Sequence, residues 1–187
     1  AIDKGKADEI IEYTPQDIDP AFFNKNKVIL KSRRGNGYWL WKPYIIKRSL
    51  EKIQYGDYLC YLDSGAYYIN QISLLARQME KDNQEIMSFE LPFLEKKYTK
   101  RDVFVCMDCD TETYTDTNQR MATMILLKKT QKVEAFVEEW LDYGQREGII
   151  TDAQNHLGKG NYKEFIQNRH DQSIFSLLCK KYGVPAY

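Results

Sequence analysis

Residues 57–65 read Asp-Tyr-Leu-Cys-Tyr-Leu-Asp-Ser-Gly, an apolar and aromatic run that ends in an acidic residue and a turn. A run of this length and aromatic content is typical of a strand buried in the centre of a sheet. Strands and helices are predicted to alternate on either side of it, which favours an α/β/α sandwich with a mostly parallel sheet. Such sheets bind ligands beyond the carboxyl ends of their strands. We therefore expect Asp63 to lie in a ligand crevice.

Apolar periodicity and capping patterns place the other elements along the chain. They predict helices over residues 20–24, 39–53, 71–81, 99–107, 131–146 and 171–181. Apolar runs predict further strands over residues 9–13, 86–91 and 121–127. No repeat, low-complexity tract or linker interrupts the chain, so residues 1–187 are interpreted as one domain.

Composition excludes several classes of partner. Lysine plus arginine and aspartate plus glutamate each number 27, so no net charge favours nucleic acid or an anionic membrane. No apolar run approaches the roughly 20 residues of a membrane span, and no signal-peptide pattern opens the sequence. The four cysteines are too few and too scattered for the disulfide framework of a small secreted domain. These features predict a cytoplasmic protein without a membrane span.

Asp63 has two interpretations from the residues alone. As a carboxylate at a strand end, followed by Ser64 and Gly65 in a tight turn, it would be presented where the backbone is exposed and approachable. Alternatively, its side chain would only accept turn hydrogen bonds from the amides of Gly65 or Ala66. The pattern leaves both open.

Residues 34–43 (RGNGYWLWKP) and 56–65 (GDYLCYLDSG) resemble a bacterial and viral group of GT-A-type glycosyltransferases, often encoded with surface-polysaccharide genes. The layout is also similar to the sugar-binding region of mannosyltransferase-like DXD enzymes. The resemblance continues through residues 98–102 and 168–178, and so covers nearly the whole chain. It implies a GT-A-like (Rossmann-like) fold and a hexosyltransferase-like enzyme of polysaccharide biosynthesis. The donor would be a nucleotide-diphosphate sugar, and the acceptor a glycan or another hydroxyl.

The resemblance also implies catalytic residues. Asp171 and Gln172 open the last predicted helix and are similar to the D-Q motif of several GT-A enzymes, which lines the acceptor side and faces the anomeric carbon. The match implies that both residues lie opposite Asp63 across the donor sugar. Asp171 would orient or deprotonate the acceptor hydroxyl.

One departure concerns the divalent metal, Mn²⁺ or Mg²⁺, that a DXD motif holds with two carboxylates. The second position here is Gly65. A hard cation would then depend on Asp63, water and diphosphate oxygens, with His170 as a possible third ligand. A lone histidine beside a helix start is, however, more often a cap or a packed residue.

The donor has further candidate contacts. Tyr38, Trp39 or Trp41 would stack on the base, and at most one of the tryptophans is expected to do so, because rings two residues apart on a helix do not share a face. Three cations would neutralise the diphosphate directly if no metal does: Arg34, Lys42 and Arg101.

A GT-A domain normally begins with a nucleotide-binding strand and helix, and residues 1–5 resemble the end of that helix. The first strand is therefore expected to be missing, with the domain truncated at both ends. This expectation, together with Gly65, favours an alternative function: a catalytically inactive GT-A-like module for glycan binding or assembly.

Overall fold

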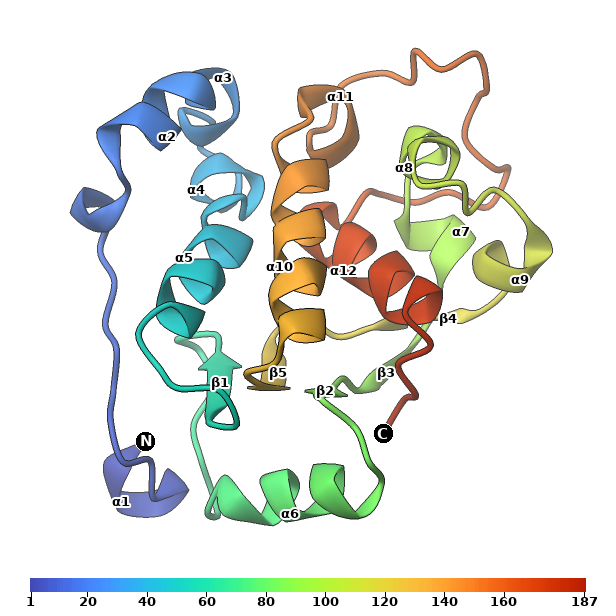
Figure 1. The fold of residues 1–187 in the computed structure, drawn as a ribbon. Helices are drawn as coiled ribbons and strands as arrows, with labels where there is room; N and C mark the ends of the chain where they lie inside the picture. Colours follow the sequence, from blue (N-terminus) through green and yellow to red (C-terminus); the bar gives the residue numbers. More distant parts are fainter.

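Strand β5 (Met124–Lys128) is the middle strand of the main sheet, with β1 (Tyr58–Leu62) and β2 (Ile86–Met87) on either side (Figure 1). This computed structural model describes residues 1–187. Both neighbours run antiparallel to β5. A separate two-stranded sheet pairs β3 (Glu90–Leu94) with β4 (Asn118–Arg120), again antiparallel. The expected Rossmann-like sandwich with a mostly parallel sheet is therefore wrong.

The path from β1 through helix α6 (Ser73–Lys81) to β2 explains this error. Because both strands are antiparallel to β5, they run parallel to each other, as alternation of strand and helix predicts. However, β5 comes from later in the chain and lies between them. Alternation indicates the direction of successive strands but not which strands become neighbours. The apolar run 58–62 is consequently a half-buried edge strand, and the buried central strand is β5.

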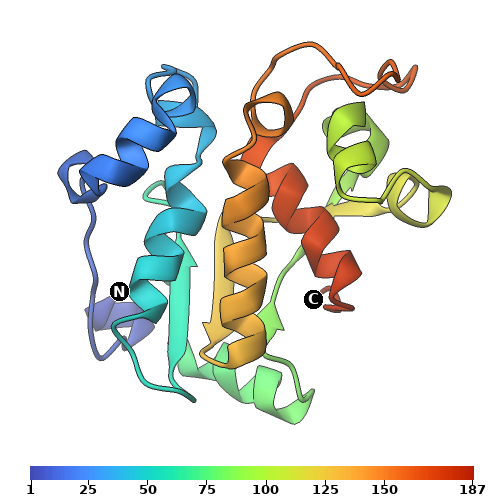
Figure 2. The ribbon, with the colours of Figure 1, turned by 45° about the horizontal axis from the view of Figure 1, so that its top comes forward.

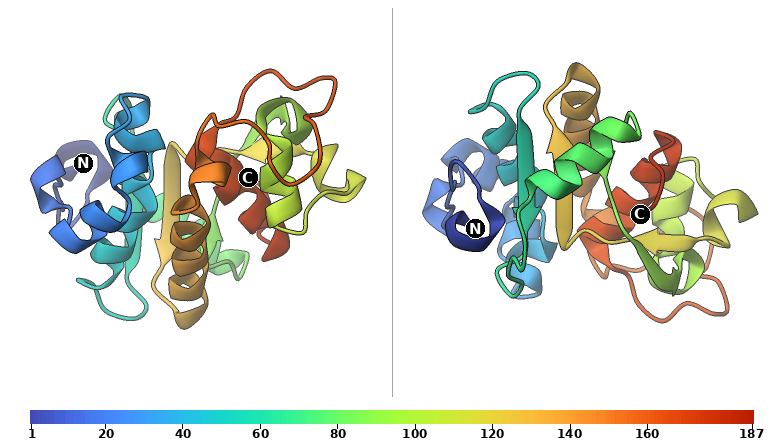
Figure 3. Two further views of the ribbon diagram at one scale, coloured as in Figure 1. Left: turned by 90° about the horizontal axis from the view of Figure 1, so that it is seen from above. Right: turned by 90° about the horizontal axis from the view of Figure 1, so that it is seen from below.

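Side chains of β5 alternate between the two faces of the sheet. Ile125 and Leu127 belong to the large core, whereas Leu126 packs with Met79 of α6 and with Met87. Helix α6 lies across this second face in the view from below (Figure 3). Three longer helices cover the first face (Figure 2): α5 (Trp41–Leu50), α10 (Gln131–Gly144) and α12 (His170–Lys181).

Helix α10 forms where the apolar spacing predicts it. Thr130 caps its start, because the Thr130 Oγ1 accepts a hydrogen bond from the Val133 amide at 3.2 Å. One face is buried in the core through residues three or four positions apart: Val133, Phe136, Val137, Trp140 and Leu141.

The remaining helices are short. Residues 9–13, expected as a strand, have no regular structure because no strand pairs with them. No helix has both the length and the apolar character that a membrane crossing requires. The short elements are α1 (Ile2–Gly5), the 3-10 turn Pro15–Asp17, α2 (Pro20–Lys25), α3 (Lys27–Leu30), α4 (Gly35–Tyr38), α7 (Glu95–Tyr98), α8 (Arg101–Cys106), α9 (Glu112–Thr115) and α11 (Glu147–Ile150).

The short element α4 and the residue after it form a left-handed turn that precedes α5. All five residues from 35 to 39 have positive φ, which costs an ordinary L-residue about 1–2 kcal/mol, and three of them are not glycine. Gly37 (φ +99°) is required there for a second reason, since an added Cβ would lie 2.8 Å from the Leu30 Cα. The turn delays the helix expected over residues 39–53, which begins at Trp41 instead.

We predict that Gly37→Ala destabilises the chain far more than Gly56→Ala. Gly56 has a similar φ of +94°, but a Cβ added there would meet no atom within 4 Å. Gly56→Ala should therefore cost only the conformational term of about 1 kcal/mol, whereas Gly37→Ala should cost about 3 kcal/mol because the Leu30 backbone must also shift. Urea denaturation measures both, and equal losses would contradict the steric argument.

Candidate functional site

The Lys42 side chain, from the first turn of α5, joins the two acidic residues that the sequence analysis selected. Lys42 is only 3% exposed. Its Nζ lies 3.0 Å from Asp171 Oδ2 and 3.4 Å from Asp63 Oδ1, and it donates to the Ala122 carbonyl at 3.1 Å. The end of β1 and the start of α12 are thus brought together. We call Lys42, Asp63 and Asp171 the Lys42 cluster.

The two carboxylates of the Lys42 cluster have different surroundings. Asp171 is buried, and burial raises the pKa of its carboxyl, although the Lys42 ammonium acts in the opposite direction. The Asp63 side chain is 35% exposed. Its Oδ1 accepts a 2.6 Å hydrogen bond from the Tyr61 hydroxyl, whose pKa is raised first by burial and then by this bond. Asp63 is therefore the carboxylate that a ligand can reach.

The turn after Asp63 bears on its two interpretations. The Ala66 amide donates to the main-chain carbonyl of Asp63 at 3.0 Å, and no hydrogen bond joins the Asp63 carboxylate to the amides of Gly65 or Ala66. The turn is therefore closed by the backbone alone. This geometry favours a carboxylate presented to ligand over one that only caps the turn.

An open hollow of about 410 Å³ lies beside the exposed carboxylate. We call it the Asp63 hollow. Ser64 and Gly65 are exposed at it, so backbone as well as side chains is accessible there. The lining residues are Trp39, Trp41, Tyr61, Asp63, Ser64, Gly65, Ala66 and Thr123.

Both tryptophans line the Asp63 hollow, although rings two residues apart were not expected to share a face. That expectation assumed that both belong to one helix. Trp39 instead lies in the left-handed turn, and only Trp41 belongs to α5. The Trp41 Nε1 donates to the Gly35 carbonyl at 3.0 Å, and a Cβ on Gly35 would overlap the Trp39 ring. The turn thus places both rings.

Trp39 and Trp41 form the aromatic wall of the Asp63 hollow, and His170 packs against Trp39. The His170 Nδ1 lies 2.7 Å from the Ile150 carbonyl, which only accepts, so Nδ1 carries the proton. Its Nε2 accepts from Arg34 Nε at 2.8 Å, and burial lowers the pKa of the ring. The ring packs against Trp39 and Tyr38, with centroids 5.6 and 4.9 Å away. Arg34 and Tyr38 therefore contact the neutral imidazole and do not line the hollow.

Arg101 belongs to a different cluster. Its Nε lies 2.7 Å from Asp110 Oδ1, and its guanidinium stacks on the Tyr162 ring at 3.8 Å. The neighbouring Lys100 donates to the Ala153 carbonyl at 2.8 Å. The contacts with Tyr162 and Ala153 anchor the loop that leads to α12, and Arg101 does not line the Asp63 hollow.

Gln172 is half-buried, and both ends of its amide have partners in the protein. Its Oε1 accepts from the Ala122 amide at 3.3 Å, and its Nε2 donates to Gln119 Oε1 at 3.0 Å. Sequence reasoning did not select Gln119 or Ala122, because a glutamine in a short polar strand and an alanine after it carry no pattern of their own.

The side chains present do not by themselves fit a divalent metal centre. No group of three or more His, Cys, Asp or Glu residues is placed to hold a metal ion. Asp63 is the single carboxylate that lines the hollow, position 65 has no side chain, and both nitrogens of His170 are engaged. We therefore derive no chemistry through a metal held by these residues.

The arrangement suits a flat or ring-shaped ligand that carries hydroxyl groups. Indole rings offer stacking faces, and the carboxylate and exposed backbone offer hydrogen-bonding partners. The chain matches no family model, no curated protein and no solved structure.

We predict that Lys42→Met costs about 3–5 kcal/mol of folding stability at pH 7, because it leaves the buried Asp171 carboxylate without its counter-charge. The pKa of Asp171 is raised in the folded chain, so the folded state keeps this proton at a pH where the unfolded chain has lost it. Lys42→Met removes the ammonium that opposes the effect of burial, so the pKa of Asp171 is raised further in the variant. The variant therefore gains more stability than the parent as the pH falls, and its deficit should shrink between pH 7 and pH 5.

Urea denaturation at both pH values measures this effect. The double variant Lys42→Met/Asp171→Asn is the control and should recover most of the loss, since no charge is then left buried. A deficit that neither acid pH nor the second substitution reduces would show that the ammonium does not serve to balance Asp171.

Proposed function

We propose that this protein transfers a sugar from a nucleotide-diphosphate donor to a hydroxyl group, on a glycan or another acceptor. The observation that carries the proposal is the Lys42 cluster at the edge of the aromatic Asp63 hollow. The two stretches that resemble glycosyltransferases, residues 34–43 and 56–65, provide most of the residues that line this hollow. Support thus comes from the geometry and from the resemblance together.

Asp63 would be the residue that contacts the donor sugar. Its carboxylate is accessible and is held in place by the Tyr61 hydroxyl, so it can accept hydrogen bonds from sugar hydroxyls without reorganising. Trp39 or Trp41 would stack on the sugar or on the base. The exposed Ser64–Gly65 backbone allows a close approach.

The charge of the cluster suits the reaction. With both carboxyls ionised, the Lys42 cluster carries two negative charges and one positive charge. Glycosyl transfer develops positive charge on an oxocarbenium-like sugar while the diphosphate leaves. A fixed net negative charge beside the sugar would stabilise that centre. Lys42 is buried against both carboxylates, so it would set the position of Asp63 and would not contact the diphosphate.

A second candidate function is glycan binding without transfer. The observation in its favour is the burial of Asp171, which is paired with Lys42 and is not presented to an acceptor hydroxyl. In this alternative the Asp63 hollow holds a sugar ring, and no residue activates the acceptor. Nucleotide release separates the two functions, because only transfer or donor hydrolysis produces free nucleotide.

We predict that the protein releases nucleotide from at least one member of a panel of UDP-, GDP- and CDP-sugars, assayed with and without Mn²⁺. Asp63→Asn should lower that rate by about 100-fold or more, since it removes the charge that faces the sugar. Its stability should change by less than about 1 kcal/mol, because the side chain is partly exposed and asparagine still accepts from Tyr61.

Asp142→Asn, an exposed position in α10, is the matched control and should leave the rate unchanged. Absence of release with every donor, with oligosaccharide binding retained, would replace transfer by the glycan-binding function. An Asp63→Asn protein that is as fast as the parent would remove Asp63 from the site.

A further inference from the structure

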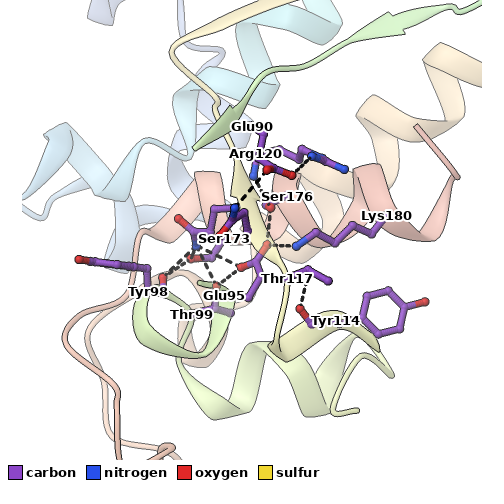
Figure 4. A network of polar contacts seen from close by, with 12 residues as sticks. Glu90, Glu95, Tyr98, Thr99, Tyr114, Thr117, Arg120, Ser173, Ser176 and Lys180 are labelled. Atoms are coloured by element: carbon purple, nitrogen blue, oxygen red, sulfur yellow. Dashed lines mark hydrogen bonds and ion pairs between the residues drawn. The ribbon is translucent and has the colours of Figure 1, made fainter. Parts of the chain in front are cut away.

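A buried polar network joins α7 and α12 around a second charged centre (Figure 4). Hydrogen bonds of Gln119 and Gln172 connect this network with the Lys42 cluster. The central residue of this network is Glu95 of α7, which is fully buried. Its carboxylate accepts from Lys180 Nζ at 2.7 Å, from Thr99 Oγ1 at 2.7 Å and from Gln119 Nε2 at 3.2 Å, and also from the Ser176 hydroxyl. The charge of Glu95 is thus balanced and fully hydrogen-bonded.

Gln119 is fully buried, and its amide can point in only one direction. The Nε2 faces the Glu95 carboxylate and, at 3.2 Å, the Tyr98 carbonyl, both of which only accept hydrogen bonds. The Oε1 must therefore face the opposite way, where it accepts from Gln172 Nε2. That bond in turn directs the Gln172 Oε1 toward the Ala122 amide.

The path ends at the candidate site. The main-chain N–H of Ala122 donates to Gln172 Oε1, and the main-chain carbonyl of the same residue accepts from Lys42 Nζ. A continuous series of hydrogen bonds thus joins Glu95 to Lys42 by way of Gln119, Gln172 and the main chain of Ala122. One N–H of the Gln172 amide has no hydrogen-bond partner in the protein, and the residue is half-buried.

We propose that Gln119, oriented by Glu95, is a positioning residue for the site: it fixes the Gln172 amide and, through the main chain of Ala122, the Lys42 ammonium between Asp63 and Asp171. The kinetic consequence of this inference rests on the proposed sugar transfer, whereas the orientation of Gln172 does not. If this network only stabilised the fold, the Glu95–Lys180 pair would be sufficient. The candidate site would then not depend on the direction of the Gln119 amide.

Gln119→Glu tests the proposal, because it keeps the size and the acceptor of the side chain but removes the donor to Glu95. Two buried carboxyls in contact share a proton, so the introduced carboxyl should have a raised pKa. The other charged groups around this position are Lys180 of α12 and Arg120 of β4 with its partner Glu90 of β3. Below the raised pKa the introduced carboxyl can again donate to Glu95 while its other oxygen accepts from Gln172.

We expect kcat for nucleotide release to fall about 10-fold or more at pH 8 relative to the parent, with KM within about twofold. The ratio of variant to parent should recover as the pH is lowered toward 5.5. Gln131→Glu, at the exposed start of α10, is the matched control and should show neither effect. A ratio that does not change with pH, or a loss confined to KM, would overturn a positioning role.

The side-chain amide resonance of Gln172, assigned by its loss in Gln172→Glu, gives a readout that does not require activity. It should shift in Gln119→Glu at pH 8, return at pH 5.5, and be unmoved in Gln131→Glu. If Gln119→Glu does not fold, Gln119→Met removes the same donor without adding charge and should shift the resonance at every pH. An unmoved Gln172 resonance overturns the inference, whether or not the parent releases nucleotide.

Discussion

The ammonium of Lys42 is the constraint on which the candidate site depends. It is buried where two carboxylates and a main-chain carbonyl converge, and these acceptors come from three different parts of the chain. Transferring a charge from water into the protein interior costs several kcal/mol of free energy unless partners compensate. The ends of β1 and α12 must therefore be in place together before this charge is satisfied, which makes the geometry of the site a condition of folding and not a surface detail.

The aromatic wall follows from a different cost. Left-handed backbone is unfavourable for Asn36, Tyr38 and Trp39, and such strain persists only where surrounding contacts over-determine it. Here the contacts are the indole hydrogen bond to Gly35 and the packing of Trp39 on the neutral His170 ring. The wall of the Asp63 hollow is thus fixed by contacts within the protein.

The sequence predicted individual elements better than their arrangement. The helices over residues 71–81, 131–146 and 171–181 are present with small shifts of their ends, because apolar spacing reports directly on a buried face. The parallel sheet was wrong, since the position of β5 between β1 and β2 depends on long-range pairing that no local pattern records.

The residues of the candidate site were likewise predicted better individually than in their contacts with one another. Asp63 was predictable as a strand-end carboxylate. The resemblance implied that Asp171 lies opposite it across a donor sugar, whereas the structure joins both carboxylates to the Lys42 ammonium and buries Asp171. The burial of Lys42 was not predicted, because a lysine near a helix start is usually solvated; its place between Trp41 and Pro43 was the one available signal. The hydrogen bonds of His170 with Ile150 and Arg34 could not be predicted either, because both partners are distant in the sequence.

Strand β5 is synthesised long after its partner β1, and this order has a consequence for folding during biosynthesis. While the ribosome is still making residues 63–123, β1 has no strand to pair with, because its partner in the register Tyr58–Lys128 does not yet exist. The apolar edge of the nascent chain stays open over that interval, and non-local pairing of this kind closes slowly. Residues 58–62 can therefore enter the sheet only after residue 128 has been synthesised.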